Sequence, residues 1–138
     1  MNQIFVDTGA WDAIVDSGDL NHELALLFQN EITGRYKLVV TNYVLDELYT
    51  LLLMNVGYRH TVEFKRQLDV LVEERILEVV WVTPEIATEA WRVFEQFNRD
   101  KEWSYTDCVS YAVMKQLDIE EVFAFDHHFE QMGFVRRP

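Results

Sequence analysis

The chain has 138 residues, 49% of them hydrophobic, so it is long and apolar enough to fold and too apolar to be intrinsically disordered. We expect a single domain over residues 1–138. The formal net charge of −12 argues against a purely electrostatic nucleic-acid binder, whose phosphate-binding surface would be basic. A single cysteine, the lack of a secretory leader and the lack of a bilayer-spanning apolar stretch favour a soluble cytoplasmic protein without membrane association.

Short apolar runs alternate along the chain with segments of helical periodicity. The first run, residues 3–6, precedes Asp7, Thr8 and Gly9, which are typical of a turn. Strands that read as continuous apolar runs indicate a mostly parallel sheet with helices on both faces, a three-layer α/β/α sandwich. The remaining strands are predicted at residues 37–40, 77–82, 122–125 and 134–135, and the helices at residues 21–33, 42–56, 61–75, 85–98 and 104–117.

Two carboxylates stand at the predicted ends of strands. Asp7 follows the first strand directly, and Asp126 follows the strand over residues 122–125. Ligands of open parallel sheets bind beyond the carboxyl ends of the strands, so both side chains are candidates for a functional crevice. For either residue alone, an aspartate that only bonds the amides of a turn explains the position equally well.

Glu47 lies on the predicted core-facing stripe of its helix, together with Val44, Leu48 and Leu51. We therefore expect its carboxylate to face inward. An inward-facing charge requires a partner, because an unpaired buried charge costs several kcal/mol. The partner is either a metal or, as the alternative, an arginine at the edge of the helix.

Asp107 comes three residues after Ser104, in the spacing of a helix capping box. Capping alone explains this spacing, but the first turn of a helix that follows the sheet also lies near the strand ends. Four acids that converge without four bases repel one another, and a hard divalent cation relieves the repulsion. Because Mg²⁺ and Mn²⁺ prefer oxygen ligands, the acids predict a metal site.

The segments around the four acids resemble the PIN domain, the nuclease fold shared by VapC-type toxins of bacterial toxin–antitoxin pairs and by RNA-processing and RNA-decay nucleases. The most specific match is Ser104-Tyr105-Thr106-Asp107, which is similar to the T-D motif of the family. Phe125-Asp126 followed by Phe129 is similar to its F-D-x-x-F strand end. The resemblance covers nearly the whole chain and rests on residues 5–11, 41–48, 104–119 and 124–129.

The resemblance implies a metal-dependent endoribonuclease that hydrolyses RNA phosphodiester bonds. Asp7, Glu47 and Asp107 would form the primary set of ligands for Mg²⁺ or Mn²⁺, and Asp126 would complete it directly or through water. Thr8 and Thr106 would be supporting hydroxyls.

The same resemblance implies the toxin of a VapBC-type pair, which would form a homodimer and be silenced by a small antitoxin protein. Two alternatives stay open. The chain is either a PIN nuclease of RNA processing that is not a toxin, or a catalytically inert PIN-like module that binds RNA or a protein.

A basic cluster follows the helix of Glu47 and is the candidate for contact with RNA phosphates. Its members are Arg59, His60, Lys65 and Arg66. The alternative interpretation is a solvated helix face, which carries such charges for solubility alone.

Other chemistries fit the sequence less well. A zinc site at His127 and His128 is disfavoured because adjacent histidines do not readily face one ion. Cys108 is disfavoured as a nucleophile because no His–Asp pair is placed to serve it. The aromatic residues Trp81, Trp91, Phe94 and Phe97 fall at spacings that predict core packing.

Two other α/β classes also place an aspartate at a strand end. A haloacid-dehalogenase-like enzyme would carry a second aspartate two residues after the first, where Gly9 stands. A receiver domain would carry a lysine after a later strand, and none is found there.

Overall fold

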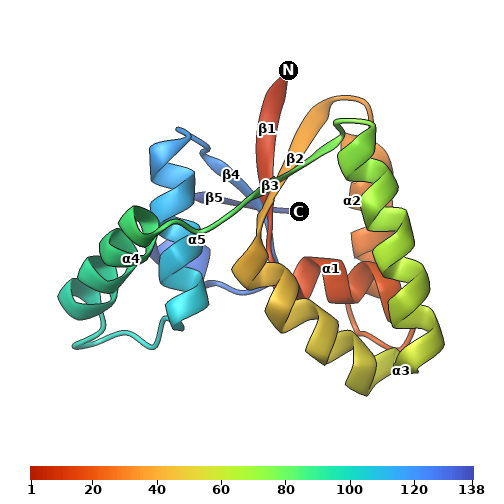
Figure 1. The fold of residues 1–138 in the computed structure, drawn as a ribbon, viewed down its shortest axis with the longest axis horizontal. Coiled ribbons are helices and arrows are strands. Elements are labelled where there is room, and N and C mark those ends of the chain that lie inside the picture. The colour runs from red at the N-terminus through yellow and green to blue at the C-terminus, as the bar shows by residue number, and fades with distance from the viewer.

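The computed structural model describes residues 1–138 and contains one five-stranded sheet. Helices flank this sheet (Figure 1). The three-layer α/β/α sandwich predicted from the sequence is confirmed. The strands are β1 (Asn2–Val6), β2 (Tyr36–Thr41), β3 (Leu77–Val80), β4 (Glu121–Phe123) and β5 (Val135–Arg137). The helices are α1 (Thr8–Val15), α2 (His22–Ile32), α3 (Asn42–Glu73), α4 (Pro84–Phe97), α5 (Tyr105–Gln116) and α6 (His128–Gln131).

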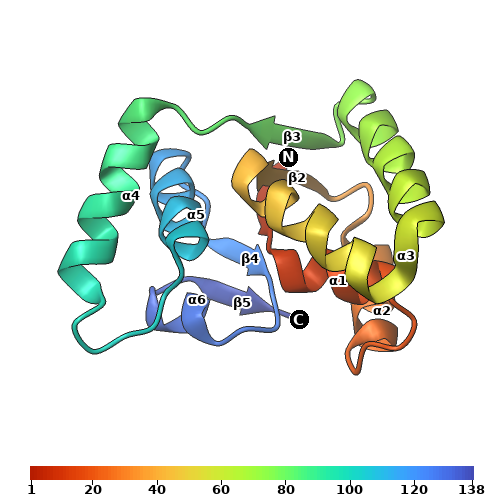
Figure 2. The same cartoon turned by 60° about the horizontal axis from the view of Figure 1, so that its bottom comes forward.

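The sheet is parallel throughout, with the strand order β3-β2-β1-β4-β5. Strand β1 lies in the middle, where Phe5 is aligned with Val39 of β2 on one side and with Val122 of β4 on the other. Helices α1, α2 and α3 lie on one side of the sheet, and α4, α5 and α6 on the other (Figures 1 and 2). The chain therefore reverses its direction across the sheet between β1 and β4, and such a switch point opens a crevice at the carboxyl ends of these two strands.

The core lies on both faces of the sheet, as expected for parallel strands covered by helices. Ile4, Phe5 and Val6 of β1 are almost completely buried. Across β4, the ring of Phe123 meets the ring of Phe28 from α2 edge to face, with 4.7 Å between the ring centroids. The central strands are thus held from both sides, which fixes the backbone from which the strand-end acids project.

Helix α3 is two helices joined at Gly57, as the sequence predicted from the glycine. Gly57 has φ +86° and ψ 175°, a conformation essentially restricted to glycine. The second half turns back over α1, where the rings of Phe64 and Trp11 meet edge to face at 5.8 Å. This bend places the two halves of α3 on either side of a groove beside the strand ends.

The turn predicted after the first strand was wrong, because helix α1 begins there. Thr8 and Gly9 form its first residues, with Asp7 at the N-cap position. Ala10, Trp11 and Ala13 pack into the core, while a Cβ at Gly9 would face open space. Gly9 therefore does not break the helix, because burial of its neighbours outweighs the weak helix propensity of glycine.

Two of the aromatic residues predicted to pack in the core are exposed. Trp81 lies just beyond β3 and is 70% exposed, and Trp91 on α4 is 53% exposed. Trp91 stacks on Phe94, which is half-buried.

No helix of the chain combines the length and the apolar character needed to cross a membrane.

Candidate active site

Four acids come from four elements around the switch point of the sheet. Asp7 follows β1 directly, and Asp126 lies in the segment between β4 and α6. Glu47 belongs to the first half of α3, and Asp107 to the first turn of α5. Both strand-end acids are therefore placed at the edge of the sheet where the crevice opens.

Asp7 is buried, and its side chain makes no capping hydrogen bond to α1. Its backbone N–H donates to the carbonyl oxygen of Phe123 at 3.0 Å, which ties it to the end of β4. Burial, followed by the charge of the nearby Asp107 carboxylate, is the main cause that raises the pKa of Asp7 from its ordinary value of 3.8 to about 7. The Thr8 amide lowers this pKa, and the weaker effects of Glu47 and Asp126 raise it. All three other acids thus lie close enough to Asp7 to repel its charge.

Asp107 forms the capping box of α5 that the sequence predicted. Its backbone N–H donates to Ser104 Oγ at 3.0 Å, and the Ser104 N–H donates to Asp107 Oδ2 at 3.3 Å. Burial raises the pKa of Asp107, whereas hydrogen bonds from His128 and Ser104 lower it. Asp107 therefore does cap α5, as the alternative interpretation held. The same carboxylate also lies close enough to Asp7 to raise its pKa.

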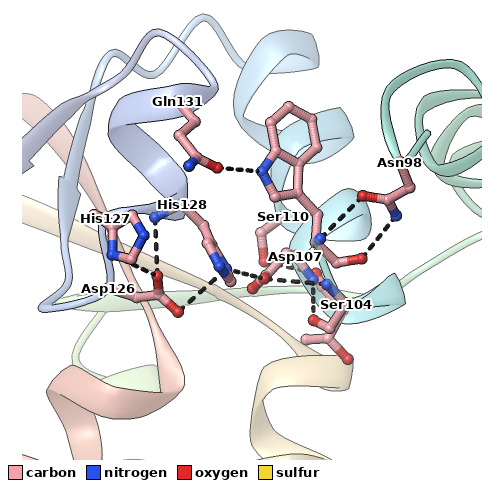
Figure 3. A network of polar contacts seen from close by, with 10 residues as sticks. Asn98, Ser104, Asp107, Ser110, Asp126, His127, His128 and Gln131 are labelled. Atoms are coloured by element: carbon pink, nitrogen blue, oxygen red, sulfur yellow. Dashed lines mark hydrogen bonds and ion pairs between the residues drawn. The ribbon is translucent and has the colours of Figure 1, made fainter. Parts of the chain in front are cut away.

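His128 connects Asp107 to Asp126, as Figure 3 shows. Its Nδ1 lies 3.2 Å from Oδ2 of each carboxylate, and its backbone N–H donates to Asp126 Oδ1 at 2.9 Å. The ligand atoms of these three residues all lie within 4.8 Å of one another. From the sequence, His128 was a candidate only for a zinc site. Its contact with Asp107, which is 21 residues away in the chain, leaves no local sequence pattern.

Glu47 is exposed, and the expectation that it faces inward was wrong. The buried stripe of this half of α3 is formed by Val44, Leu45, Leu48 and Leu52. The stripe is thus rotated toward Leu45 and away from Leu51, which leaves Glu47 at its edge. There its charge still acts on Asp7, so the side chain borders the crevice without being buried.

The structure brings the predicted residues together to different degrees. Asp7 and Glu47 do not belong to a group of three ligand atoms within 4.8 Å, so their joint binding of one cation with Asp107 stays a prediction. Thr8 and Thr106 both border the groove beside the acids. Thr8 Oγ1 is buried and has no hydrogen-bond partner in the protein.

This arrangement suits a hard divalent cation. Four carboxylates act on one another, and the pKa of buried Asp7 is raised to about 7, so the acids cannot all be ionised without a positive charge among them. His128 contacts Asp107 and Asp126 but leaves Asp7 and Glu47 without a basic partner. An all-oxygen set of this kind matches the ligands that Mg²⁺ and Mn²⁺ prefer.

A groove of about 1170 Å³ runs from the acids along the two halves of α3 toward β3. Glu47, Thr8 and Thr106 stand at its border with the acid cluster. Its walls are mostly apolar and aromatic, and they include Tyr43, Leu45, Tyr49, Met54, Leu68, Val72, Val79 and Trp81. Trp81, which is exposed just beyond β3, is thus part of this apolar wall.

The basic cluster is exposed, and part of its charge is paired within its own helix. Lys65 Nζ lies 2.5 Å from an Asp69 oxygen, and Arg66 lies 3.6 Å from Glu63. Lys65 also lines the groove. For Arg66 the solvated-face alternative is favoured, and RNA contact by Arg59, His60 and Lys65 stays a prediction.

Cys108 is buried beside Asp107 on α5. Burial, and to a lesser degree the charge of Asp107, raises the pKa of its thiol to about 11. The thiolate, which is the nucleophilic form, is therefore scarce at neutral pH. This agrees with the sequence argument against a cysteine nucleophile.

Comparison with known proteins identifies the same family as the sequence motifs. A sequence profile described as the PIN domain matches residues 4–135. The chain is 32% identical over 133 residues to a protein of Mycobacterium tuberculosis named 23S rRNA-specific endonuclease VapC20, covering 96% of this chain and 95% of the relative. It is 28% identical over 126 residues to a VapC ribonuclease of Archaeoglobus fulgidus, covering 90% and 77%.

A comparison with solved structures finds the same relative, VapC20, as the sequence comparison. The crystal structure of Mycobacterium tuberculosis VapC20, described as a sarcin-ricin loop cleaving toxin, matches with a TM-score of 0.83 and 30% identity over 96% of this chain and 97% of the other. FitAcB of Neisseria gonorrhoeae matches with a TM-score of 0.68 over 99% and 97% of the two chains. Its identity of 14% establishes a shared fold alone.

Proposed function

Since the chain belongs to the PIN domain family, we propose that it is a Mg²⁺- or Mn²⁺-dependent endoribonuclease that hydrolyses RNA phosphodiester bonds. The observation that carries the proposal is the gathering of four carboxylates at the switch point, where burial and then the charges of the other three acids raise the pKa of Asp7 to about 7. Structural acids are usually paired with bases, whereas a site for a divalent cation is built from acids that repel one another.

Each acid has a distinct part in this proposal. Asp7 and Asp107, the more buried pair, would hold the cation, with Glu47 at the rim and Asp126 beside His128 as further ligands. A bound divalent cation would activate water as the nucleophile and stabilise negative charge on the phosphate. Thr8 Oγ1, buried without a protein partner, is placed to bond a carboxylate or a water of the site.

The proposed substrate class is structured ribosomal RNA. The similar protein of Mycobacterium tuberculosis is named for cleavage of 23S rRNA, and the two chains align over nearly their full lengths. The groove beside the acids presents Tyr43, Tyr49 and Trp81, on which unpaired bases can stack. Recognition through bases in a loop would not require the broad basic surface that the chain lacks.

We also propose that the protein is the toxin of a VapBC-type pair, with a small antitoxin and a homodimeric state. The groove supports a protein partner, because it is large, apolar and continuous with the acids. A segment lying in it would cover the catalytic site and could extend an arginine to the carboxylates. A cytoplasmic location follows from the same proposal, because ribosomal RNA is found there.

The test is cleavage of ribosomes and of purified rRNA with Mg²⁺ or Mn²⁺, followed by primer extension to map the cut. We expect cutting that is abolished by EDTA and by Asp7→Asn, and strongly reduced by Glu47→Gln. Glu95→Gln is the matched control, since Glu95 is an exposed acid on α4 outside the groove and should leave cleavage unchanged.

Each outcome separates the proposed function from its rivals. A folded protein that binds RNA equally with and without EDTA, and equally in the wild type and Asp7→Asn, is the inert PIN-like module. Cutting of many RNAs without preference for ribosomal RNA supports a nuclease of RNA processing instead of a ribosome-directed toxin.

A further inference from the structure

We propose that His128 is a positioning residue that orients the carboxylates of Asp107 and Asp126 toward a shared divalent cation. This inference rests on the proposed metal-dependent function and extends it to a residue outside the four acids. Its basis is the set of contacts in Figure 3, where His128 contacts the carboxylates of both Asp107 and Asp126.

His128 holds both oxygens of Asp126. The backbone N–H of His128 donates to Oδ1 at 2.9 Å, and its ring Nδ1 lies 3.2 Å from Oδ2. The side chain of Asp126 is 42% exposed, so packing contributes little to its orientation. The other nearby group, His127 Nδ1, is 4.0 Å away, beyond hydrogen-bonding distance. The orientation of Asp126 therefore depends mainly on His128.

Asp107 is held on one oxygen and left free on the other. Oδ2 accepts from the Ser104 N–H at 3.3 Å and lies 3.2 Å from His128 Nδ1. Oδ1 accepts no hydrogen bond from the protein. The capping box and His128 thus use the same oxygen, which leaves Oδ1 available to a cation.

The ring nitrogen between the carboxylates is a donor. Ionised carboxylates only accept hydrogen bonds, so with both acids ionised around a cation, Nδ1 serves their two oxygens at 3.2 Å in the tautomer that carries its proton there. A protonated imidazole nitrogen has no lone pair with which to bind a metal. Because Mg²⁺ also prefers oxygen, the ring serves the ligands instead of acting as one.

The fold holds His128 in this place. It is the first residue of α6, and the next residue, Phe129, is completely buried. Gln131 of the same turn accepts from Trp103 Nε1 at 2.9 Å, which attaches α6 to the segment before α5. Helix α6 is therefore anchored beside the first turn of α5, where Asp107 lies.

The experiment measures Mn²⁺ binding to the purified full chain by EPR titration and by calorimetry, in wild type, His128→Ala, His128→Asn and His127→Ala. Loss of a hydrogen-bond partner of a ligating carboxylate weakens metal affinity about 10- to 100-fold, which is the result expected for His128→Ala. His128→Asn should recover a large part of the affinity, because an amide N–H can replace the Nδ1 donor. His127→Ala, an exposed neighbour, should bind Mn²⁺ within about twofold of wild type.

Electron spin echo measurements on the Mn²⁺ complex distinguish a positioning residue from a ligand. We expect no coupling to a directly bound imidazole nitrogen in the wild type, whereas a strong ¹⁴N coupling that disappears in His128→Ala would overturn the proposal. Equal Mn²⁺ affinity in wild type, His128→Ala and His128→Asn would also overturn it. If the wild type itself binds no Mn²⁺, the proposed function fails first and this inference with it, so the two failures are distinguishable.

Discussion

Replacement of Asp7 by asparagine should stabilise the metal-free protein relative to wild type, increasingly so as the pH rises. Asp7 is buried among acids, and its pKa in the folded protein is raised from 3.8 to about 7. For a group whose pKa is raised on folding, the associated stability is fully present below the unfolded pKa and is lost as the pH rises through the folded pKa. Asparagine cannot ionise, so the variant does not suffer this loss.

The magnitude follows from the two pKa values. The difference between 3.8 and about 7 is roughly three pH units, and each unit corresponds to about 1.4 kcal/mol, so wild type loses about 4 kcal/mol in total. Roughly 2.5 kcal/mol of that loss falls between about pH 5 and pH 8, with the slope flattening toward the upper end. Any pH-independent effect of the buried amide cancels when the two proteins are compared across this range.

The assay is urea unfolding in EDTA at several pH values from about 5 to 8, followed by tryptophan fluorescence. The buried residues Trp11 and Trp103 report the loss of the core. Addition of Mg²⁺ or Mn²⁺ at the upper pH should restore stability to wild type alone, by about 2.7 kcal/mol at a concentration 100 times the Kd. A stability difference that does not change with pH would refute the placement of Asp7 as a buried acid repelled by its neighbours.

Three further predictions concern the backbone, a helix cap and the thiol. Gly57→Ala should destabilise by about 1–3 kcal/mol in urea unfolding, because the φ of +86° at the bend of α3 strains any residue with a Cβ. The control Gly9→Ala, within a helix and facing open space, should be neutral or stabilise by about 0.5–1 kcal/mol. Thr41→Val removes the oxygen that accepts from the Val44 N–H at 3.1 Å and should cost roughly 1 kcal/mol by the same measurement. Cys108 should resist alkylation by iodoacetamide in the folded protein and react in urea, since its pKa is about 11, and rapid labelling at neutral pH would contradict its burial.

The sheet and most helices could be predicted because their patterns are local. Buried parallel strands read as apolar runs, and Gly57 indicated the division of α3. Helix α1 was missed because it has eight residues and begins with Thr8 and Gly9, which are typical of turns. Its formation depends on burial of Trp11 against the second half of α3, a tertiary contact that periodicity over so short a segment does not reveal.

The positions of the acids could be predicted because the carboxyl ends of parallel strands meet at one edge of the sheet. The orientation of Glu47 could not be predicted, because three apolar residues leave the direction of the buried helix face uncertain by about one residue position. Leu45 and Leu52 are buried and Leu51 is not, and this shift leaves Glu47 at the border of the stripe. The role of His128 requires the anchoring of α6 beside α5, which no spacing in the sequence encodes.

The acidity of the chain constrains how it can recognise RNA. Many of its cations are already committed to acids: Arg92 to Glu89, Arg136 to Glu130, and Arg137 to Glu121. Neutralisation of many phosphates by basic side chains therefore cannot supply most of the binding energy, and the affinity should depend only weakly on salt. A cation among the acids would reverse the local charge where the scissile phosphate has to lie, and the aromatic groove beside it offers stacking that is insensitive to charge. Such a site would favour an RNA whose unpaired bases project from a loop over one that offers only a charged backbone.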